Sequence, residues 1–296
     1  MANSAGGDDF IFEWLDADTG AMFRRGTLLE AVATAHQQIE VFDTPGLGKM
    51  FRLDGCNMTS ERDEFFYHEN LVHPAALAQA APATALVIGG GDGGSIEELF
   101  KHPSIERVVM AELDPEVVRI ARAHLQSVHR GALDDKRLEI RIGDGFEFLR
   151  QTKESFDLLL MDLTDPVGPT AALYSSEFFQ AAKRVLRPAG TLALHVGSPF
   201  FQPRRFARTL RNLTETFAIV RPYFVHIPLY GANWGMACAS LQTDPLQLSA
   251  DEVDVRLTAR RISQLRYVNG DTFRAGFALP NYVRELTTES GTSWQA

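Results

Sequence analysis

The stretch that decides the fold is residues 85–100, which read ALVIGGGDGGSIEELF. Four apolar residues in a row are typical of a strand that is covered on both faces. The glycines allow the backbone to turn sharply and to approach a ligand closely. The helix that begins near Gly94 points its free N–H groups toward the same place. The stretch therefore predicts the strand, turn and helix that open many nucleotide-binding α/β domains, although such turns also simply join strands to helices.

Length and composition set the class of protein. The chain has 296 residues, of which 45% are hydrophobic, so it can form one large domain or a large domain with a small one. Its net charge of −9 argues against nucleic acid as the main partner. The negative charge suits a small cationic ligand, but it also simply favours solubility.

The sequence carries no signal for a membrane or for export. No apolar run is long enough to cross a bilayer, and residues 1–9 lack the basic start and apolar block of a signal peptide. Cys56 and Cys238 lie far apart and do not form a metal-binding pair, so we predict reduced thiols, no metal site and a cytoplasmic location.

The first part of the chain predicts a small β-rich domain. Residues 38–42 and 49–53 alternate in polarity and are expected to form a hairpin. Residues 60–77 are expected to form a helix with Ser60 as its N-cap and acidic residues in its first turn. Small residues follow, and we place the domain boundary there. The expected organisation is a disordered segment 1–9, an N-terminal β-rich domain 10–80 and a catalytic domain 81–296.

After the glycine turn, strands and helices alternate. The strands are expected at 107–113, 138–142, 156–161, 191–196, 218–227 and 235–240. The helices are expected at 115–128, 175–186, 206–216 and 251–266. This order predicts an α/β fold with a doubly wound, mostly parallel sheet.

Acidic residues stand at the ends of four predicted strands. They are Asp92, Glu112, Asp144 and Asp162, and Asp165 lies three residues beyond the last of them. Ligands of open parallel sheets bind at the carboxyl ends of the strands. The acid at the end of the second strand, here Glu112, is the usual partner of the two ribose hydroxyls of an adenosine. Asp144 can accept from the adenine amino group, although capping of a helix explains it as well.

These acids predict an adenosine ligand of the S-adenosylmethionine or NAD type, and Asp92 helps to choose. A pyrophosphate on this turn would face the Asp92 carboxylate, which is electrostatically unfavourable. Ordinary S-adenosylmethionine would place its own carboxylate nearby. Decarboxylated S-adenosylmethionine carries only a sulfonium and an ammonium, which Asp92 attracts. The residues therefore favour, without fixing, the decarboxylated form.

Three segments together resemble the polyamine aminopropyltransferases, the spermidine synthase family. They are residues 88–94 (IGGGDGG), 143–146 (GDGF) and 162–169 (DLTDPVGP). The resemblance runs in order from about Gln37 to about Pro280, and its upstream part includes residues 36–42, 53–55 and 61–69. It implies a methyltransferase-like Rossmann domain preceded by a small N-terminal β-domain, a homodimer or homotetramer, and decarboxylated S-adenosylmethionine as co-substrate with no tightly bound cofactor.

The resemblance also implies roles for individual residues. Asp162 matches the residue that accepts a proton from the attacking amine, and Asp165 matches a second acid that holds this amine. The positions that match contacts to the aminopropyl and amine groups are Asp92, His68, Tyr67 and Tyr230. The positions that match contacts to the nucleoside are Gln37, Gly89, Gly91, Glu112, Asp144, Gly145 and Pro169. A turn at Asp162 and Asp165, and core packing of both tyrosines, are the alternatives.

The chemistry of aminopropyl transfer explains these residue types. The leaving group is a neutral thioether, so its expulsion needs no acid. The attacking primary amine is protonated at pH 7, because its pKa is roughly 10. Asp162 can take that proton, and we expect Asp165 and partial burial to raise its pKa. The other acids are expected to hold both cations in line for the reaction.

The chain departs from the family pattern at four positions. The family usually has Gln where Met58 stands, often Gln at His195, Thr at Leu229 and often His at Phe273. The first change is expected to weaken a nucleoside contact. The other three are expected to lie toward the amine groove and leave the acceptor open.

The identity of the acceptor is the open question. Residues 73–77 and 233–240 resemble thermospermine synthases, but those enzymes tend to have Glu at the position of Asp92. We expect putrescine as acceptor, with spermidine as the alternative. A small-molecule S-adenosylmethionine methyltransferase and a non-catalytic binding protein are the rival functions.

Overall fold

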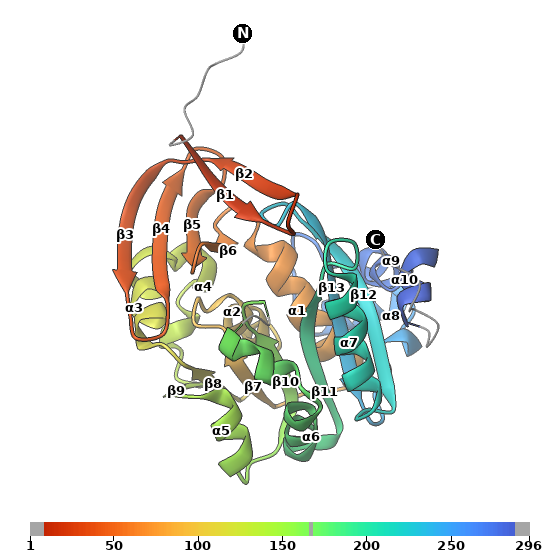
Figure 1. The fold of residues 1–296 in the computed structure, drawn as a ribbon. Helices are drawn as coiled ribbons and strands as arrows, with labels where there is room; N and C mark the ends of the chain where they lie inside the picture. The colour runs from red at the N-terminus through yellow and green to blue at the C-terminus, as the bar shows by residue number, and fades with distance from the viewer. Residues whose placement is uncertain (1–8, 166–167, 288–296) are drawn as a thin grey trace.

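The computed structural model describes residues 9–165 and 168–287 (Figure 1). The strands are β1 (Phe10–Trp14), β2 (Gly20–Arg24), β3 (Thr27–Ala33), β4 (Gln38–Thr44), β5 (Gly48–Leu53), β6 (Cys56–Ser60), β7 (Thr84–Gly89), β8 (Arg107–Glu112), β9 (Leu138–Ile142), β10 (Phe156–Asp162), β11 (Leu186–Gly197), β12 (Ile219–Ile227) and β13 (Ala232–Ser240). The helices are α1 (Glu64–Ala78), α2 (Gly94–Phe100), α3 (Pro115–His124), α4 (Gln126–His129), α5 (Gly145–Gln151), α6 (Ser176–Val185), α7 (Pro203–Thr214), α8 (Ala250–Ala259), α9 (Gly270–Gly276) and α10 (Asn281–Thr287). Short 3-10 helices lie at Ala132–Asp134, Gly168–Tyr174 and Pro245–Gln247.

The central sheet has seven strands in the order β12-β13-β11-β10-β7-β8-β9. Strands β7 to β11 pair in parallel with their neighbours, whereas β13 runs antiparallel between β11 and β12. The predicted α/β fold with a mostly parallel, doubly wound sheet is confirmed. The chain builds outward from β7 to β9 and then returns to β10 on the other side of β7. Ligands of such sheets bind where the strand order reverses, which is at the carboxyl ends of β7 and β10.

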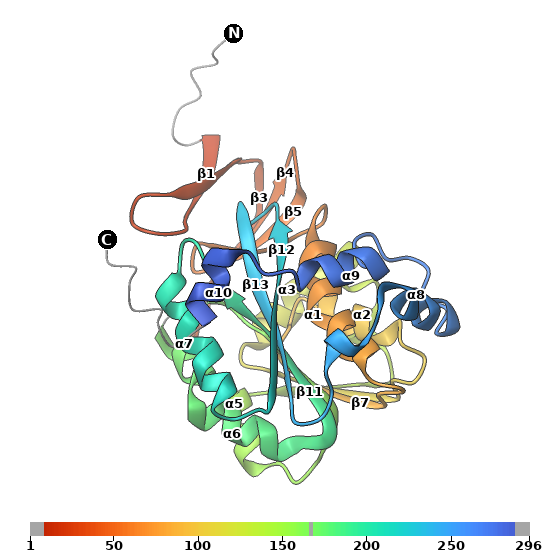
Figure 2. The same cartoon turned by 90° about the vertical axis from the view of Figure 1, so that its right-hand side faces the viewer.

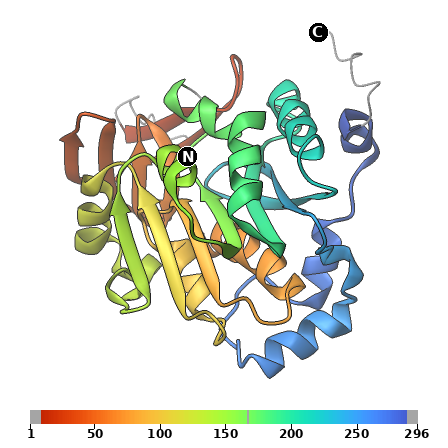
Figure 3. The same cartoon turned by 90° about the horizontal axis from the view of Figure 1, so that it is seen from below.

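The buried strands are apolar on both sides because helices cover both faces of the sheet (Figure 3). Alternate residues of β7 show this division, with Val87 in one core cluster and Leu86 and Ile88 in the other. Residues of α1, α2, α3, α8 and α9 complete the first cluster, and residues of α5, α6, α7 and α10 the second. Figure 2 shows α10 beside α7, and α9 packs against β12. Within the described ranges, no helix combines the length and the apolar character that crossing a membrane requires.

The N-terminal strands form a four-stranded antiparallel sheet, β3-β4-β5-β6, and a separate hairpin of β1 and β2. The predicted hairpin is confirmed, with Phe42 of β4 opposite Met50 of β5. Phe51 and Met58 of this sheet line the same cavity as the glycine turn. The N-terminal sheet therefore covers the carboxyl ends of the central strands, as the red and orange strands in Figure 1 show.

Several predicted boundaries are wrong. Ser60 is not an N-cap, because it ends β6 in register with β5 and its hydroxyl bonds to Asp63 over 2.5 Å. The helix expected at 115–128 divides between α3 and α4, and the one expected at 251–266 ends at Ala259. β6, α5, α9 and α10 were not predicted.

The domain boundary near residue 80 stays a prediction. Helix α1 was assigned to the N-terminal domain, and it packs against the central sheet, where the Tyr223 hydroxyl donates to the Asn70 carbonyl over 2.7 Å. The disorder expected for residues 1–9 falls, apart from Asp9, outside the described residues.

Candidate active site

The glycine turn packs closely against two other elements. A Cβ on Gly91 would lie 2.8 Å from Oε2 of Glu112, and one on Gly94 would lie 2.2 Å from the ring of His68. Both glycines are therefore required by close approach rather than by the turn alone. The turn brings the end of β8 and the first half of α1 to the carboxyl end of β7.

A cavity of about 210 Å³ lies at this crevice. It is lined by most of the predicted site residues, namely Gln37, Tyr67, His68, Gly89, Gly91, Asp92, Glu112, Asp144, Gly145, Asp162 and Tyr230. Asp165 lines a neighbouring cavity instead. Pro169 lies in the 3-10 helix Gly168–Tyr174, and its side chain is outside the described part of the structure. The elements that supply these residues come from both the N-terminal sheet and the central sheet.

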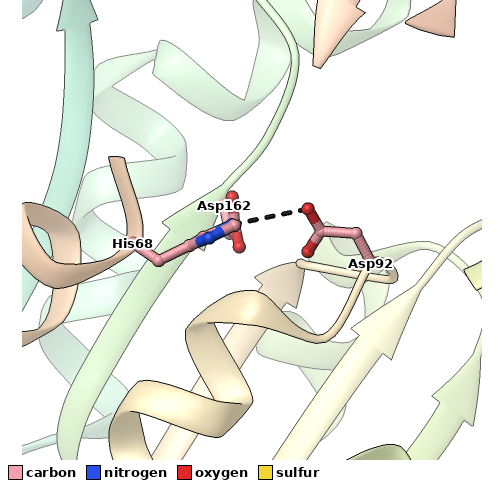
Figure 4. Close-up of side chains that lie close together, drawn as sticks. All are labelled: His68, Asp92 and Asp162. Atoms are coloured by element: carbon pink, nitrogen blue, oxygen red, sulfur yellow. Dashed lines mark ion pairs between the residues drawn. The ribbon is translucent and has the colours of Figure 1, made fainter. Parts of the chain in front are cut away.

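A buried histidine links two acids at one end of this cavity. His68 Nδ1 lies 2.9 Å from Oε2 of Glu64, and Nε2 lies 3.4 Å from Oδ2 of Asp92 (Figure 4). Burial opposes the charging of His68, but the two carboxylates raise its pKa well above the ordinary value. The imidazolium in turn outweighs the burial of Asp92 and lowers the pKa of that acid. His68 is thus a fixed cation that keeps Asp92 ionised.

Asp162 lies opposite this pair. Burial is the largest cause that raises its pKa to about 6, and the Asp92 carboxylate adds to the effect. His68 and a hydrogen bond of 2.5 Å from the Ser95 hydroxyl act in the other direction. The predicted rise is present, but the prediction that Asp165 causes it is wrong, because Asp92 is the acid that acts on Asp162. With a pKa of about 6, Asp162 is a carboxylate at neutral pH and binds a proton more tightly than an ordinary Asp does.

The same three side chains could be mistaken for a metal site. Ligand atoms of His68, Asp92 and Asp162 lie within 4.8 Å of one another. A metal needs a neutral imidazole, whereas Glu64 and Asp92 hold His68 in its protonated form. The cluster therefore favours an organic cation, which binds by charge and hydrogen bonds without displacing the proton.

The Tyr67 hydroxyl lies beside Asp162 at this end of the cavity. It is buried, and its hydrogen bond to Asp162 lowers the pKa of that acid. Burial and then the charge of Asp162 raise its pKa well above the ordinary value, so it stays a neutral donor and acceptor. Tyr230, by contrast, donates its hydroxyl to the Met58 carbonyl over 2.9 Å. Of the two tyrosines, Tyr67 is the one whose hydroxyl lies beside Asp162, and its oxygen can still accept a hydrogen bond from a ligand.

Glu112 lines the same cavity from the end of β8, against the glycine turn. It is 7% exposed, and burial raises its pKa to about 7, although the N–H of Asp114 donates to it over 2.9 Å. Asp114 also accepts from the Gln37 amide over 3.1 Å, which fixes Gln37 at the cavity wall. Asp144 caps α5 by accepting from the Phe146 N–H over 2.7 Å, so the capping role considered for it is real.

A second cavity of about 40 Å³ adjoins the first, and Tyr67, Met58 and Tyr230 line both. Asp165 lines this smaller cavity together with Glu13 of β1. Burial raises the pKa of Glu13 to about 7. The sequence analysis missed Glu13, whose only signal is an acid between aromatic residues in a β-prone segment. Solvent exposure of alternate strand positions explains that pattern equally well.

The four departures from the family pattern fall in different places. Met58 lines both cavities and His195 lines the smaller one. Both ring nitrogens of His195 are engaged, by Tyr174 at 2.7 Å and by Trp234 at 3.4 Å. Leu229 and Phe273 are core residues that line neither cavity, so the prediction that they face the amine groove is wrong.

Comparisons with known proteins agree with this geometry. Residues 64–249 match the model of the spermine/spermidine synthase domain. The chain is 46% identical to a polyamine aminopropyltransferase of Nitrosomonas europaea over 95% of this chain and 87% of that protein. It is 38% identical to polyamine aminopropyltransferase 2 of Hyperthermus butylicus over 95% of this chain and 93% of that protein.

Solved structures extend the likeness to three dimensions. A spermidine synthase in complex with the transition state analogue AdoDATO superposes with a TM-score of 0.88 and 33% identity, covering 94% of each chain. The spermidine synthase of Thermotoga maritima superposes with a TM-score of 0.87 and 34% identity, again covering 94% of each. The chain belongs to the spermine/spermidine synthase family and is an aminopropyltransferase.

Proposed function

We propose that this chain transfers the aminopropyl group of decarboxylated S-adenosylmethionine to putrescine, giving spermidine and methylthioadenosine. The observation that carries the proposal is the pairing of Asp92 with His68 beside an Asp162 whose pKa is about 6. Glu64 adds a third acid at this end. Glu64 also pairs with Arg130 over 3.3 Å, so three acids face two cations. The region stays negative, which attracts a sulfonium and an ammonium and repels the carboxylate of ordinary S-adenosylmethionine.

In this proposal Asp162 removes the proton from the attacking amine. Its raised pKa makes it a better acceptor than an ordinary carboxylate, while it stays ionised at neutral pH. The Tyr67 hydroxyl, which hydrogen-bonds to Asp162, accepts a hydrogen bond from the same amine through its oxygen and directs the lone pair of the amine at the carbon next to the sulfonium. The carbon–sulfur bond breaks as the carbon–nitrogen bond forms, and the sulfur leaves as a neutral thioether.

The nucleoside half occupies the other end of the larger cavity. We assign Glu112 to the ribose hydroxyls, with Gln37, Gly89, Gly91 and Gly145 lining the nucleoside site. Asp144 and Pro169 keep the role that the family resemblance implies, at the adenine. For Asp144 the cap of α5 uses Oδ1, so contact with the adenine falls to Oδ2.

The acceptor is placed across the two cavities. Its reacting amine lies between Asp162 and Tyr67, and its far ammonium lies in the smaller cavity near Glu13, Asp165 and Tyr230. The small volume of that cavity, about 40 Å³, supports a short diamine such as putrescine over spermidine.

An acceptor screen tests the proposal. Purified protein is incubated with decarboxylated S-adenosylmethionine and, separately, with putrescine, cadaverine, spermidine or spermine, and the products are separated by chromatography. We expect methylthioadenosine and spermidine in equal amounts with putrescine. Release of methylthioadenosine with spermidine alone overturns the acceptor assignment. Tighter calorimetric binding of S-adenosylmethionine than of its decarboxylated form overturns the co-substrate.

We also propose that the chain assembles as a homodimer or homotetramer through the hairpin of β1 and β2. Phe12 and Met22 are cross-strand partners that are 51% and 56% exposed, and Trp14 is 72% exposed. Apolar side chains gathered on one hairpin support an interface between copies of the chain. Light scattering on the wild type and on Trp14→Ser tests this, and a monomeric wild type overturns it. A cytoplasmic location is proposed on the free thiols of Cys56 and Cys238, and cell fractionation tests it.

A further inference from the structure

Asp165, the acid that was expected to hold the acceptor amine, already forms an ion pair with Arg205. Oδ2 of Asp165 lies 2.5 Å from Nη1 of Arg205 and accepts from the Gln202 amide over 3.0 Å. Asp165 and Arg205 are 28% and 22% exposed, so solvent screens the pair only in part. The proton transfer proposed above uses neither Arg205 nor Gln202.

Arg205 occupies an unfavourable position for its own helix. It lies in the first turn of α7, which begins at Pro203 and contains no acidic residue in that turn. The N-terminus of a helix is positive, so an arginine there is destabilising unless another contact compensates. The charge of Arg205 is unfavourable at the start of α7, and its ion pair with Asp165 compensates. Residues whose local position is unfavourable for stability are often found at functional sites.

The end of β11 is shaped to admit these side chains. Gly197 has a φ of +80°, and a Cβ on it would lie 2.5 Å from Oε1 of Gln202 and 3.7 Å from Cδ of Arg205. A larger residue at this position would displace Gln202 from Asp165. The pairing of Asp165 thus depends on three neighbouring features, which are Gly197, Gln202 and Arg205.

The ion pair of Asp165 and Arg205 changes the net charge around the smaller cavity. Asp165 and Arg205 cancel, which leaves Glu13 as the other acid that lines the cavity. Glu13 accepts from the Asn57 N–H over 2.9 Å and is attracted by Arg52. His195 adds no charge there, since burial lowers its pKa. Without Arg205 the same cavity would gain Asp165 as a second acid with no cation paired to it, because Arg52 acts on Glu13. One acid balances one distal ammonium, whereas two acids balance the two distal cations of a triamine.

We propose that Arg205 is a specificity-determining residue that neutralises Asp165 and thereby restricts the acceptor to a diamine. This inference rests on the proposed function, because it describes the amine end of the same site. Arg205 acts through Asp165 and does not touch the reacting atoms. The structure assigns the far ammonium of the acceptor to Glu13. Asp165 instead binds Arg205, whose positive charge disfavours a second distal cation.

The test compares acceptor preference in Arg205→Gln with that in Arg204→Gln. Arg204 is the exposed neighbour on the same helix and serves as the matched control. We expect Arg205→Gln to raise the ratio of kcat/KM for spermidine over putrescine about tenfold, the effect of about 1.4 kcal/mol from one partly screened charge. Most of the change should lie in KM, because Arg205 is remote from the bond that forms. An unchanged ratio overturns the inference.

Two further variants separate charge from structure. Arg205→Lys keeps the charge, so its ratio should stay within about threefold of the wild type even though its geometry differs. A ratio in Arg205→Lys equal to that in Arg205→Gln overturns the electrostatic argument. In an Asp165→Asn background, Arg205→Gln should no longer raise the ratio, because the arginine then has no acid to neutralise.

The acceptor measurements distinguish an error in the role of Arg205 from an error in the proposed function. If the wild type releases methylthioadenosine with putrescine but the variants leave the ratio unchanged, only the role of Arg205 is lost. If the wild type prefers spermidine over putrescine, both the diamine assignment and this inference are wrong.

Discussion

The Ser95 hydroxyl donates to Oδ2 of Asp162 over 2.5 Å, from the second residue of the helix that follows the glycine turn. A hydrogen bond to the charged form of an acid lowers its pKa. His68 and then Ser95 therefore hold the pKa of Asp162 at about 6 against burial and the charge of Asp92, which both raise it. The helix after the glycine turn thus contributes to the basicity of the proposed proton acceptor.

We predict that Ser95→Ala shifts the acidic limb of the pH profile of kcat/KM upward by about one unit, because the lost bond favoured the ionised form of Asp162. The wild-type rate should fall as the pH drops through about 6, since Asp162 must be ionised to accept a proton. Profiles of both proteins between pH 5 and pH 9 measure the shift. Ser127→Ala, at an exposed residue, should leave the limb in place.

Asp162→Asn should lose turnover and keep nucleoside binding. We expect kcat to fall by at least ~10²-fold, because the amide cannot accept the proton of the amine. The dissociation constant for methylthioadenosine should change little, because Glu112 is untouched. Steady-state kinetics and calorimetry measure the two effects. A variant with wild-type turnover would remove Asp162 from the mechanism.

Glu112 should make nucleoside binding depend on pH. Its pKa is about 7 in the unliganded chain, and ribose hydroxyls donate hydrogen bonds that favour the carboxylate. Methylthioadenosine should therefore bind more tightly at pH 8 than at pH 6 and displace a proton on binding. Glu112→Gln should weaken binding about tenfold or more and remove this dependence. Calorimetry in buffers of different ionisation enthalpy counts the proton, and equal wild-type affinity at both pH values contradicts the assignment.

Glu69 should contribute to stability rather than to chemistry. This buried carboxylate accepts from the backbone N–H groups of Arg266, Tyr267 and Val268 over 2.6 to 2.8 Å. Glu69→Ala leaves these donors without an acceptor, so the free energy of unfolding should fall by about 3 kcal/mol or more. Urea unfolding measures the loss. Glu147→Ala, at an exposed residue, should cost less than about 0.5 kcal/mol, and a loss of that size in Glu69→Ala would contradict this role.

The sequence was informative where a local pattern of residues determines the secondary structure. Buried parallel strands read as apolar runs, so β7, β8 and β10 were predicted to within a residue. The acids at their ends were identified because parallel strands bring their carboxyl ends to one edge. Asp92, Glu112, Asp144 and Asp162 accordingly line one cavity.

The sequence was less informative where long-range packing decides. The pairing of Asp165 with Arg205 joins residues forty positions apart, and Glu13 reaches the smaller cavity from the first strand. No local pattern reports such contacts. Ser60 has the side chain of a helix cap, but tertiary pairing places it in β6. Leu229 and Phe273 were assigned to the amine groove by analogy, whereas the core holds them.

The close packing around Gly91 and Gly94 also bears on how this enzyme can diversify. Any side chain at these positions collides with Glu112 or His68, so the half of the site that holds the co-substrate tolerates little mutation. The cavity proposed for the far end of the acceptor is lined by Glu13 and Asp165, and Asp165 is paired with Arg205 of α7. The described lining of that cavity contains no residue of the glycine turn. Under the proposed function, a substitution there changes which amine is accepted and leaves the contacts of Gly91 with Glu112 and of Gly94 with His68 in place.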